Sequence, residues 1–322
     1  MSGAPAQDPD RQPRRLRSGD VVRIVAPAGP VSPDVLEKSV AILTSWGLDV
    51  RIGDHILDRH PTFDYLAGTD ADRARDLTHA WCDPDVAAVF CARGGYGSMR
   101  VLDLLDWSAM AKVAAVRPPP VFTGSSDITG LHDVIRSRLG VPTVFGAMVA
   151  SPPFVDDPVA QEHVRRLLFE PDAGVVLAGA QAEPLVAGGA RGHTVGGNLS
   201  LLACGVGVQD VSPPRTGAIA LLEDVGEEPY RLDRYVTHLR RAGWFAEVAG
   251  IALGSFVECG DLAVVREVLA DRLGDLGVPI VWQLGFGHCA GQLAVPLGTE
   301  VELVSDPSTG TARLMLTEPV FS

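Results

Sequence analysis

Residues 121–135 read VFTGSSDITGLHDVI and place two serines and an aspartate between a β-rich run and a helical pattern. A serine at a sharp strand-to-helix turn exposes its hydroxyl, and the N–H groups beside it can stabilise an oxyanion. The usual motif is Gly-x-Ser-x-Gly, of which only the first half is present, at Gly124-Ser125-Ser126. The same serines would also suit a helix N-cap. The stretch alone therefore leaves two roles open, nucleophile and cap.

A second glycine-containing segment, RGGYGS at residues 93–98, also follows a strand-like run and precedes a helix-like one. It could bind phosphate, let backbone N–H groups approach a substrate, or form only a tight turn. It has the spacing of neither nucleotide-binding glycine motif. In a parallel sheet, strands ending near 93 and 124 would open at one edge, where open α/β folds bind ligands.

Two acids end an apolar run in the second half of the chain. Glu223 and Asp224 close GAIALLED at 217–224, and an acid at a strand end can orient a catalytic base. The alternative is an ion-pair cluster that caps a helix predicted over 229–242. That alternative is the better interpretation for three further acids, Glu227, Glu228 and Asp233.

His288, in GFGHCAGQ, is flanked by small residues that leave room for a ligand. The other seven histidines lie in polar loops or on helices. His55 and Asp58 form an H-x-x-D without further ligand spacing, and no C-x-x-C occurs, so we expect no catalytic metal and no cofactor. The segment GGARGHTVGGNLSLLAC at 188–204 is glycine-rich before an apolar helix and could bind an anion or link two domains.

Composition limits the class of protein. The chain has 322 residues and a formal charge of −13, which disfavours nucleic acid and anionic lipid as partners. No apolar run reaches the roughly 18 residues of a membrane helix. Five cysteines, an odd number, indicate reduced thiols and a cytoplasmic location. Residues 1–18 are polar and proline-bearing, and we expect a disordered leader there.

Strand-like and helix-like segments alternate through the first half, which predicts a parallel sheet covered on both faces. The second half has strands at 217–224, 248–256 and 279–286 and a hairpin near its end. We therefore expect an α/β protein with an N-terminal parallel-sheet domain, flavodoxin- or amidotransferase-like, and a smaller C-terminal mixed α/β domain. The predicted bounds are 19–150 for the first domain, 151–187 for a linker and 188–322 for the second.

Taken together, five segments resemble the serine LD-carboxypeptidase family, which includes muropeptide LD-carboxypeptidases and microcin C immunity peptidases. The segments are RGGYGSMRVLDLLD, GSSDITGLH, GGNLSLL, LLEDVGEEPYRLDRYVTHL and GHCAGQLAVPLG, in the family's order, from about residue 20 to 305.

The resemblance implies a Ser-Glu-His triad of Ser126, Glu223 and His288. The family pattern Gly, aromatic, Ser, Asp makes Ser126 the nucleophile and leaves Ser125 in place of the aromatic residue. The oxyanion hole would consist of the N–H of Asp127 and a glycine N–H of the 94–95 pair, taken as Gly95. A second departure is Phe145-Gly146-Ala147, where the family has His-Gly-Pro.

The implied reaction is removal of the terminal D-Ala from a murein tetrapeptide during cell-wall recycling, by a cytoplasmic homodimer. The site would lie in the cleft between the two domains, and its substrate-binding residues are not assigned. An immunity-type peptidase that cleaves an acyl link in a peptidyl-nucleotide antibiotic is the alternative activity. A non-catalytic small-molecule binding protein on the same fold is the alternative class, and a nucleotide-dependent enzyme is a more distant one.

Overall fold

The computed structural model describes residues 12–208 and 213–322. Contacts divide the described chain into unit 1, which runs to Pro171 and includes Phe321 and Ser322, and unit 2, Asp172–Val320. The domain and linker bounds expected from the sequence stay a prediction. Residues 151–187, the predicted linker, contain the helices α6 and α7 and the strands β6 and β7.

Unit 1 is built on a parallel sheet in which β5, β4, β3, β1 and β2 are neighbours in that order. Its strands are β1 (Val21–Val25), β2 (Asp49–Ile52), β3 (Val86–Cys91), β4 (Val121–Gly124) and β5 (Thr143–Phe145). Its helices are α1 (Pro33–Ser45), α2 (Asp70–Cys82), α3 (Ser98–Val101), α4 (Trp107–Val116), α5 (Thr129–Leu139), α6 (Pro152–Val155) and α7 (Pro158–Phe169), with short 3₁₀ helices at Leu102–Leu104 and Ser126–Ile128.

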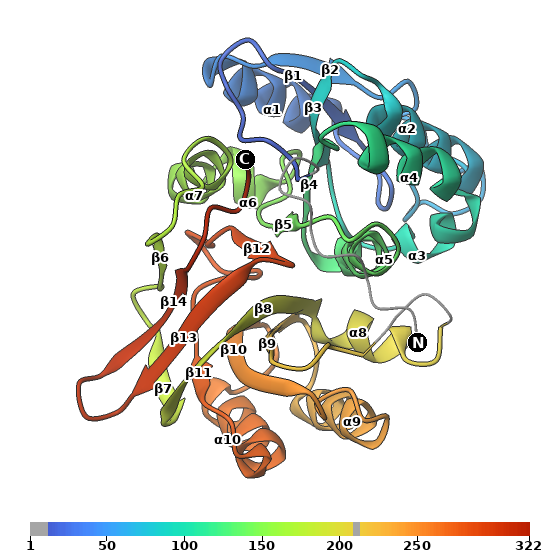
Figure 1. Cartoon of the computed structure of the whole chain (residues 1–322). Coiled ribbons are helices and arrows are strands. Elements are labelled where there is room, and N and C mark those ends of the chain that lie inside the picture. Colours follow the sequence, from blue (N-terminus) through green and yellow to red (C-terminus); the bar gives the residue numbers. More distant parts are fainter. Residues whose placement is uncertain (1–11, 209–212) are drawn as a thin grey trace. The chain divides into compact units, whose positions relative to one another are not determined.

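Burial explains why these strands form. Every residue of β3, β4 and β5 is buried, as expected for strands covered on both faces. Helix α1 packs on α6, while α2, α4 and α5 pack against one another on the other side of the sheet (Figure 1). Thr69 caps α2 by accepting the N–H of Asp72, and Gly140, with φ of 67°, ends α5.

Part of the predicted leader packs on unit 1. Leu16 is buried and donates its N–H to Leu168, and Arg15 donates its N–H to Ser322. Arg14 makes two hydrogen bonds of 2.8 Å to the Asp20 carboxylate. These contacts involve residues 14–18 of the predicted leader, whereas residues 1–11 lie outside the described residues.

Unit 2 is built on a mixed sheet with the order β6-β14-β13-β8-β9-β10-β11-β7. The strands of this sheet are β6 (Val176–Leu177), β7 (Glu183–Val186), β8 (Gly188–Asn198), β9 (Ala218–Val225), β10 (Val248–Val257), β11 (Ile280–Trp282), β13 (Glu300–Asp306) and β14 (Thr311–Leu316). A further strand of unit 2, β12 (Val295–Leu297), is not part of it. Its helices are α8 (Leu199–Gly205), α9 (Pro229–Arg241) and α10 (Leu262–Leu273), followed by a 3₁₀ turn at Gly274–Leu276.

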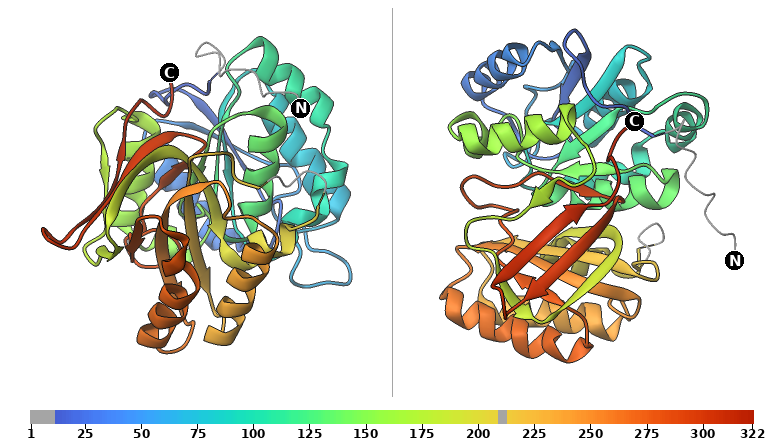
Figure 2. Two further views of the ribbon diagram at one scale, coloured as in Figure 1. Left: turned by 60° about the horizontal axis from the view of Figure 1, so that its bottom comes forward. Right: turned by 60° about the vertical axis from the view of Figure 1, so that its left-hand side comes forward.

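The apolar faces of the three helices share one core with strands β8 to β11. Leu199 of α8, Leu232 of α9 and Leu269 of α10 are all fully buried in it. Strands β8 to β11 run parallel, and β13 and β14 add an antiparallel hairpin, drawn in red in Figure 2. The α/β class, with a parallel sheet in the first part and a mixed sheet in the second, is confirmed.

The glycine-rich residues of 188–204 lie in strand β8, and the apolar residues that follow belong to helix α8. The interdomain link is wrong because the whole run lies inside unit 2, and anion binding by this run stays a prediction. Its glycines permit close approach of the neighbouring strand. A Cβ added at Gly196, where φ is 120°, would lie 2.1 Å from the carbonyl oxygen of Leu221 on β9. One added at Gly192 would lie 1.7 Å from the carbonyl oxygen of Gly217. The glycines therefore serve strand packing.

No helix in residues 12–208 or 213–322 is long and apolar enough to cross a membrane.

The close approach at β8 makes a stability prediction. We expect Gly196→Ala to lower the free energy of unfolding by about 2–4 kcal/mol, because the methyl group would meet backbone at a strained φ. Gly189→Ala on the same strand is the control, since its Cβ would meet only the Leu303 carbonyl oxygen at 3.6 Å. Urea titration of both variants measures the difference, and equal stabilities would contradict the packing argument.

Candidate active site

The turn from β4 into α5 has a strained backbone at Ser126. Its φ is 58°, in the left-handed region that non-glycine residues rarely occupy. The turn is closed by the N–H of Ile128, which donates to the Ser125 carbonyl at 3.0 Å, and by the Thr129 hydroxyl, which donates to the Ser126 carbonyl at 2.7 Å. Because strain of this kind concentrates at functional sites, Ser126 is the stronger candidate of the two serines.

Ser125 has a different environment. Its backbone is extended, the residue is 6% exposed, and its N–H donates to the Met148 sulfur at 3.4 Å. Ser125 occupies the N-cap position of the 3₁₀ turn at 126–128, but its side chain makes no capping hydrogen bond there. The N-cap role is therefore wrong for Ser125.

Residues 93–97 bring a glycine directly against Ser126. A Cβ added at Gly94 would lie 3.0 Å from the Ser126 Cβ and 2.9 Å from the Met148 Cε, so a side chain there would press on Ser126. The Gly94 carbonyl accepts the N–H of Gly29 at 2.9 Å. In a trans peptide the C=O and N–H point in opposite directions, so the N–H of Gly95 points away from Gly29.

The buried side chain of His132 forms hydrogen bonds beside the turn that carries Ser126. The Nε2 of His132 on α5 lies 2.9 Å from the Gly124 carbonyl, and its Nδ1 lies 2.9 Å from the Thr143 hydroxyl. Since a carbonyl only accepts, Nε2 carries the proton and Nδ1 accepts from Thr143. Burial lowers the pKa of His132 to about 4, which keeps the ring neutral. The Gly124 carbonyl also accepts the N–H of Gly146, within the Phe145-Gly146-Ala147 departure.

In unit 2 the structure brings Glu223 and His288 together. Glu223 lies near the end of β9 with no exposed surface, and its Oε2 is 2.6 Å from the Nδ1 of His288. An ionised carboxylate can only accept, so in the neutral imidazole Nδ1 carries the proton and Nε2 keeps its lone pair. The backbone requires glycine beside this pair, because a Cβ at Gly287 would lie 2.7 Å from Glu223 Oε2.

The electrostatics of this pair favour the charged imidazolium. Burial by itself would lower the pKa of His288, but the Glu223 hydrogen bond and the charges of Glu223 and Asp224 outweigh it, and the net pKa is raised. Burial, and then the Glu223 charge, raise the pKa of Asp224 to about 6.

Two polar residues that the sequence did not single out hold the two carboxylates in place. The Asn198 amide donates to Glu223 Oε1 at 3.2 Å and to Asp224 Oδ1 at 2.9 Å. The Ser200 N–H donates to Asp224 Oδ2 at 2.8 Å. Asn198 is also the N-cap of α8, so the start of that helix orients the acids. The signal available in the sequence was the Gly-Gly-Asn-Leu-Ser segment itself.

Of the three acids predicted to form an ion-pair cluster that caps α9, Glu227 and Asp233 form ion pairs, and the capping role is wrong for Glu228. Glu227 lies 3.4 Å from Arg231 and Asp233 lies 3.7 Å from Arg272. Glu228 precedes α9 at its N-cap position but makes no side-chain cap.

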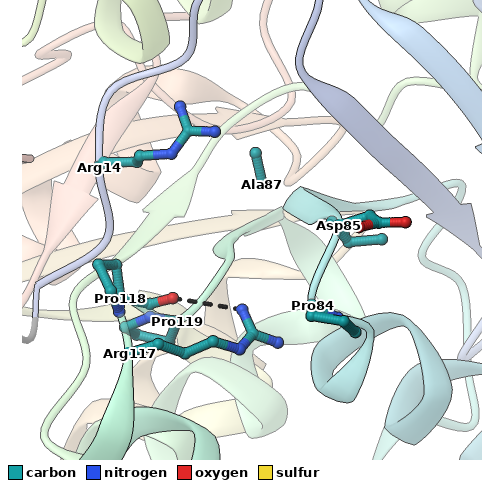
Figure 3. A pocket seen from close by; sticks show the side chains of 8 residues that line it. Arg14, Pro84, Asp85, Ala87, Arg117, Pro118 and Pro119 are labelled. Carbon is teal, nitrogen blue, oxygen red and sulfur yellow. Dashed lines mark hydrogen bonds between the residues drawn. The ribbon is translucent and has the colours of Figure 1, made fainter.

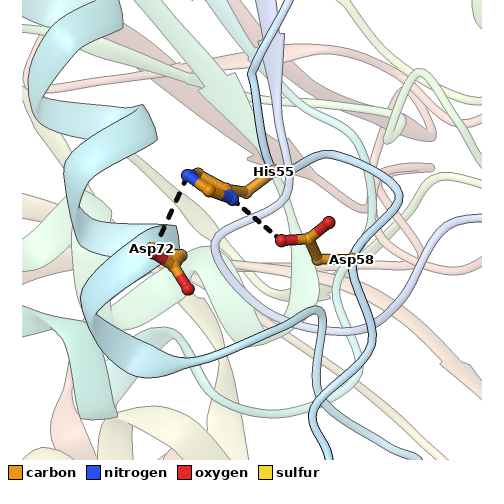
Figure 4. A group of neighbouring side chains, drawn as sticks. All are labelled: His55, Asp58 and Asp72. Carbon is orange, nitrogen blue, oxygen red and sulfur yellow. Dashed lines mark hydrogen bonds and ion pairs between the residues drawn. The ribbon is translucent and has the colours of Figure 1, made fainter.

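One group of side chains in unit 1 has metal-ligand chemistry. His55, Asp58 and Asp72 lie with their ligand atoms within 4.8 Å of one another (Figure 4). Asp72 was missed because it comes from α2, 14 residues after Asp58. Arg75 lies 3.1 Å from His55 Nε2 and 3.0 Å from Asp72, so a guanidinium already pairs with two of the three side chains. We interpret the group as a surface ion-pair network.

A cavity of about 160 Å³ lies at the amino ends of β3 and β4, whereas Ser126 follows the carboxyl end of β4 (Figure 3). Arg14 there is paired with Asp20, and Arg117 donates to the carbonyl groups of Cys82 and Asp83. Both guanidinium groups are thus already used by the fold. The lining residues are Arg14, Pro84, Asp85, Val86, Ala87, Arg117, Pro118 and Pro119.

The Glu223–His288 pair makes a prediction that needs no substrate. Glu223→Gln removes the charge that raises the pKa of His288 and leaves the burial that lowers it, so the pKa should fall. An NMR titration of the His288 ring measures it. Glu227→Gln removes a carboxylate that pairs with Arg231 and does not act on His288, so it should leave the titration unchanged. Equal pKa values in all three proteins would contradict the assignment.

Comparison with known proteins identifies the family. Residues 22–146 match the model of the LD-carboxypeptidase N-terminal domain, and residues 191–303 match that of the C-terminal domain. A putative carboxypeptidase of Streptomyces coelicolor is 51% identical over 303 residues, 94% of this chain and 96% of that protein. The murein tetrapeptide carboxypeptidase of Pseudomonas aeruginosa is 34% identical over 307 residues, 92% of this chain and 96% of that protein. The crystal structure of an MccF-like protein from Bacillus anthracis has the same fold, with a TM-score of 0.85 and 23% identity over 95% of this chain and 99% of that one. The chain therefore belongs to the LD-carboxypeptidase family.

Proposed function

We propose that this protein is a serine LD-carboxypeptidase that removes the terminal D-Ala from murein tetrapeptide. The observation that carries the proposal is the 2.6 Å pair of His288 and the buried Glu223, which leaves one imidazole nitrogen able to accept a proton. The strained Ser126 and the 34% identity to a murein tetrapeptide carboxypeptidase support it. In this proposal Ser126 is the nucleophile, His288 the general base and Glu223 the group that orients it.

The reaction proceeds by acyl transfer. The Ser126 oxygen attacks the carbonyl carbon before the terminal D-Ala while Nε2 of His288 takes the hydroxyl proton. The C–N bond then breaks, and His288 returns that proton to the leaving amine of D-Ala. Water attacks the acyl-enzyme by the same route and releases the shortened peptide and Ser126.

The oxyanion of each tetrahedral intermediate would accept hydrogen bonds from the N–H groups of Asp127 and Gly95. The Asp127 N–H follows the nucleophile directly, as in other strand-to-helix elbows. The peptide between Gly94 and Gly95 has its carbonyl engaged by Gly29, which directs the Gly95 N–H to the other side. Two such donors supply much of the rate enhancement in acyl transfer.

We also propose that the enzyme acts in the cytoplasm as a homodimer. The cysteine pattern supports the location, because five cysteines without a C-x-x-C are typical of a reducing compartment. The family resemblance supports the dimer. Light scattering at micromolar concentration tests the oligomeric state.

The nucleophile assignment is tested by D-Ala release from L-Ala-γ-D-Glu-meso-Dap-D-Ala. We expect Ser126→Ala to lower kcat by at least about 1,000-fold, because the acyl-enzyme cannot form. Ser125→Ala is the matched control and should retain kcat within about threefold, since Ser125 is buried and makes no capping bond. Release that survives in Ser126→Ala would overturn the mechanism.

If none of these three proteins releases D-Ala, the substrate assignment is wrong. An aminoacyl sulfamoyl nucleoside and a fluorophosphonate serine probe then separate the two alternatives. Cleavage of the nucleoside conjugate would indicate an immunity-type peptidase, and inertness toward both reagents would indicate a binding protein.

The pH dependence follows from the raised pKa of His288. The base must be neutral to accept a proton, so kcat/KM should fall as the pH drops through a pKa above the ordinary value of 6.5. In Glu223→Gln this acid limb should move to lower pH while the maximal rate decreases. Wild-type activity that stays constant from pH 8 to pH 5 would exclude His288 as the base.

A further inference from the structure

The strand-to-helix turn that carries Ser126 is joined to the glycine segment 94–98 by two reciprocal hydrogen bonds. The Ser98 N–H donates to Oδ2 of Asp127 at 2.7 Å, and the Ser98 hydroxyl donates to the Asp127 carbonyl. Ser98 has no exposed surface and Asp127 is 2% exposed. Each residue therefore uses both a side chain and its backbone to hold the other.

Burying the carboxylate of Asp127 costs free energy unless hydrogen-bond donors surround it. Burial raises its pKa, while hydrogen bonds from the backbone of Ser98 and Gly97 and the nearby Arg73 charge act in the opposite direction. A buried carboxylate stays favourable only when donors surround it, so Asp127 needs the N–H groups at the start of α3. The pairing is thus specific for this segment.

The other side of the segment is held by Arg73, which is 2% exposed. Its Nη1 donates to the Gly97 carbonyl at 2.9 Å and also to the Pro27 carbonyl. Gly97 has φ of 124°, and a Cβ there would lie 2.7 Å from Nη1 of Arg73. The segment 94–98 is therefore fixed from both sides by buried polar groups, with Gly94 against Ser126.

We propose that Ser98 and the Asp127 side chain are positioning residues that set the spacing of the two oxyanion donors. One donor is the N–H of Asp127 itself, and the other, that of Gly95, lies three residues before Ser98. The inference rests on the proposed function, because it assigns the clamp to the oxyanion hole of that reaction. Neither side chain exchanges protons with the substrate.

The clamp is tested first without any substrate, by hydrogen exchange in a peptide that covers residues 93–98. In Asp127→Ala we expect exchange there to accelerate by at least about tenfold, and Ser98→Ala should have a smaller effect. Asp127→Asn should stay close to wild type, because an amide oxygen still accepts the Ser98 N–H. Asp133→Asn is the matched control. This substitution changes a partly buried carboxylate that pairs with Arg136 on α5 at 2.5 Å and makes none of the clamp's bonds.

Kinetics then test the catalytic consequence. Loss of one well-placed oxyanion donor costs about 100-fold or more in kcat, so we expect that scale for Asp127→Ala, with KM within about threefold. Fluorophosphonate labelling of Ser126 should slow in parallel. If the role were merely structural, Asp127→Ala would lower the folded fraction and the melting temperature. It would not lower kcat selectively with KM nearly unchanged, and Asp127→Asn would not restore kcat. If Asp127→Ala does not fold, Ser98→Ala carries the test.

The outcomes separate the two proposals. Unchanged exchange in Asp127→Ala and Ser98→Ala would overturn the clamp, whatever the enzyme acts on. Faster exchange with kcat and labelling no lower than in Asp133→Asn would overturn its catalytic role. A wild-type protein that neither labels nor releases D-Ala would overturn the proposed function and with it the catalytic role, while the exchange data still decide the clamp itself.

Discussion

The left-handed backbone of Ser126 is the constraint on which the arrangement of unit 1 depends. A non-glycine residue at a φ of 58° costs on the order of 1–3 kcal/mol, so neighbouring contacts must hold it there. The Gly124 carbonyl before the turn accepts from His132 and from Gly146. Those contacts bring α5 and the end of β5 to one peptide group. The strain persists because a fully packed sheet and helix surround it.

Absence of a side chain matters at the same place. Glycine at position 94 lets the segment lie directly against Ser126, because a Cβ would press on Ser126 and Met148. Gly97 must be glycine because Arg73 occupies the space where a side chain would go. A segment with two such glycines would be mobile in isolation, since glycine loses much conformational entropy on ordering. The bonds from Asp127, Ser98 and Arg73 offset that loss.

In unit 2 the main constraint is the burial of two adjacent carboxylates. Glu223 and Asp224 are both buried, and their mutual repulsion contributes to the pKa of about 6 at Asp224. Asn198 donates to both acids. The imidazole of His288 accompanies Glu223 as the partner that can become positively charged. The connection from β8 to α8 therefore helps to orient the Glu223 side chain, which in turn orients His288.

Local pattern in the sequence was sufficient for the elements and for the family. The sequence pattern predicted a helix over 229–242, within a residue of the observed ends of α9. Motif order was sufficient to nominate Ser126, Glu223 and His288, because each lies in a short segment with its own residue pattern. The alternation of strand-like and helix-like segments was sufficient to predict that the first sheet is parallel.

Tertiary structure alone decided which residues support these three. Ser98, His132 and Asn198 lie in segments that carry the resemblance, but the roles of these residues and of Arg73 depend on partners between eight and 46 residues away. The glycines of β8 resembled a loop because glycine is permissive in many settings. Only the tertiary structure shows why they belong to a strand, because a Cβ added at Gly196 would lie 2.1 Å from the Leu221 carbonyl oxygen on β9. Local residue patterns carry backbone preference and chemistry, whereas the contacts that hold a strained turn or a buried charge exist only once distant segments have packed.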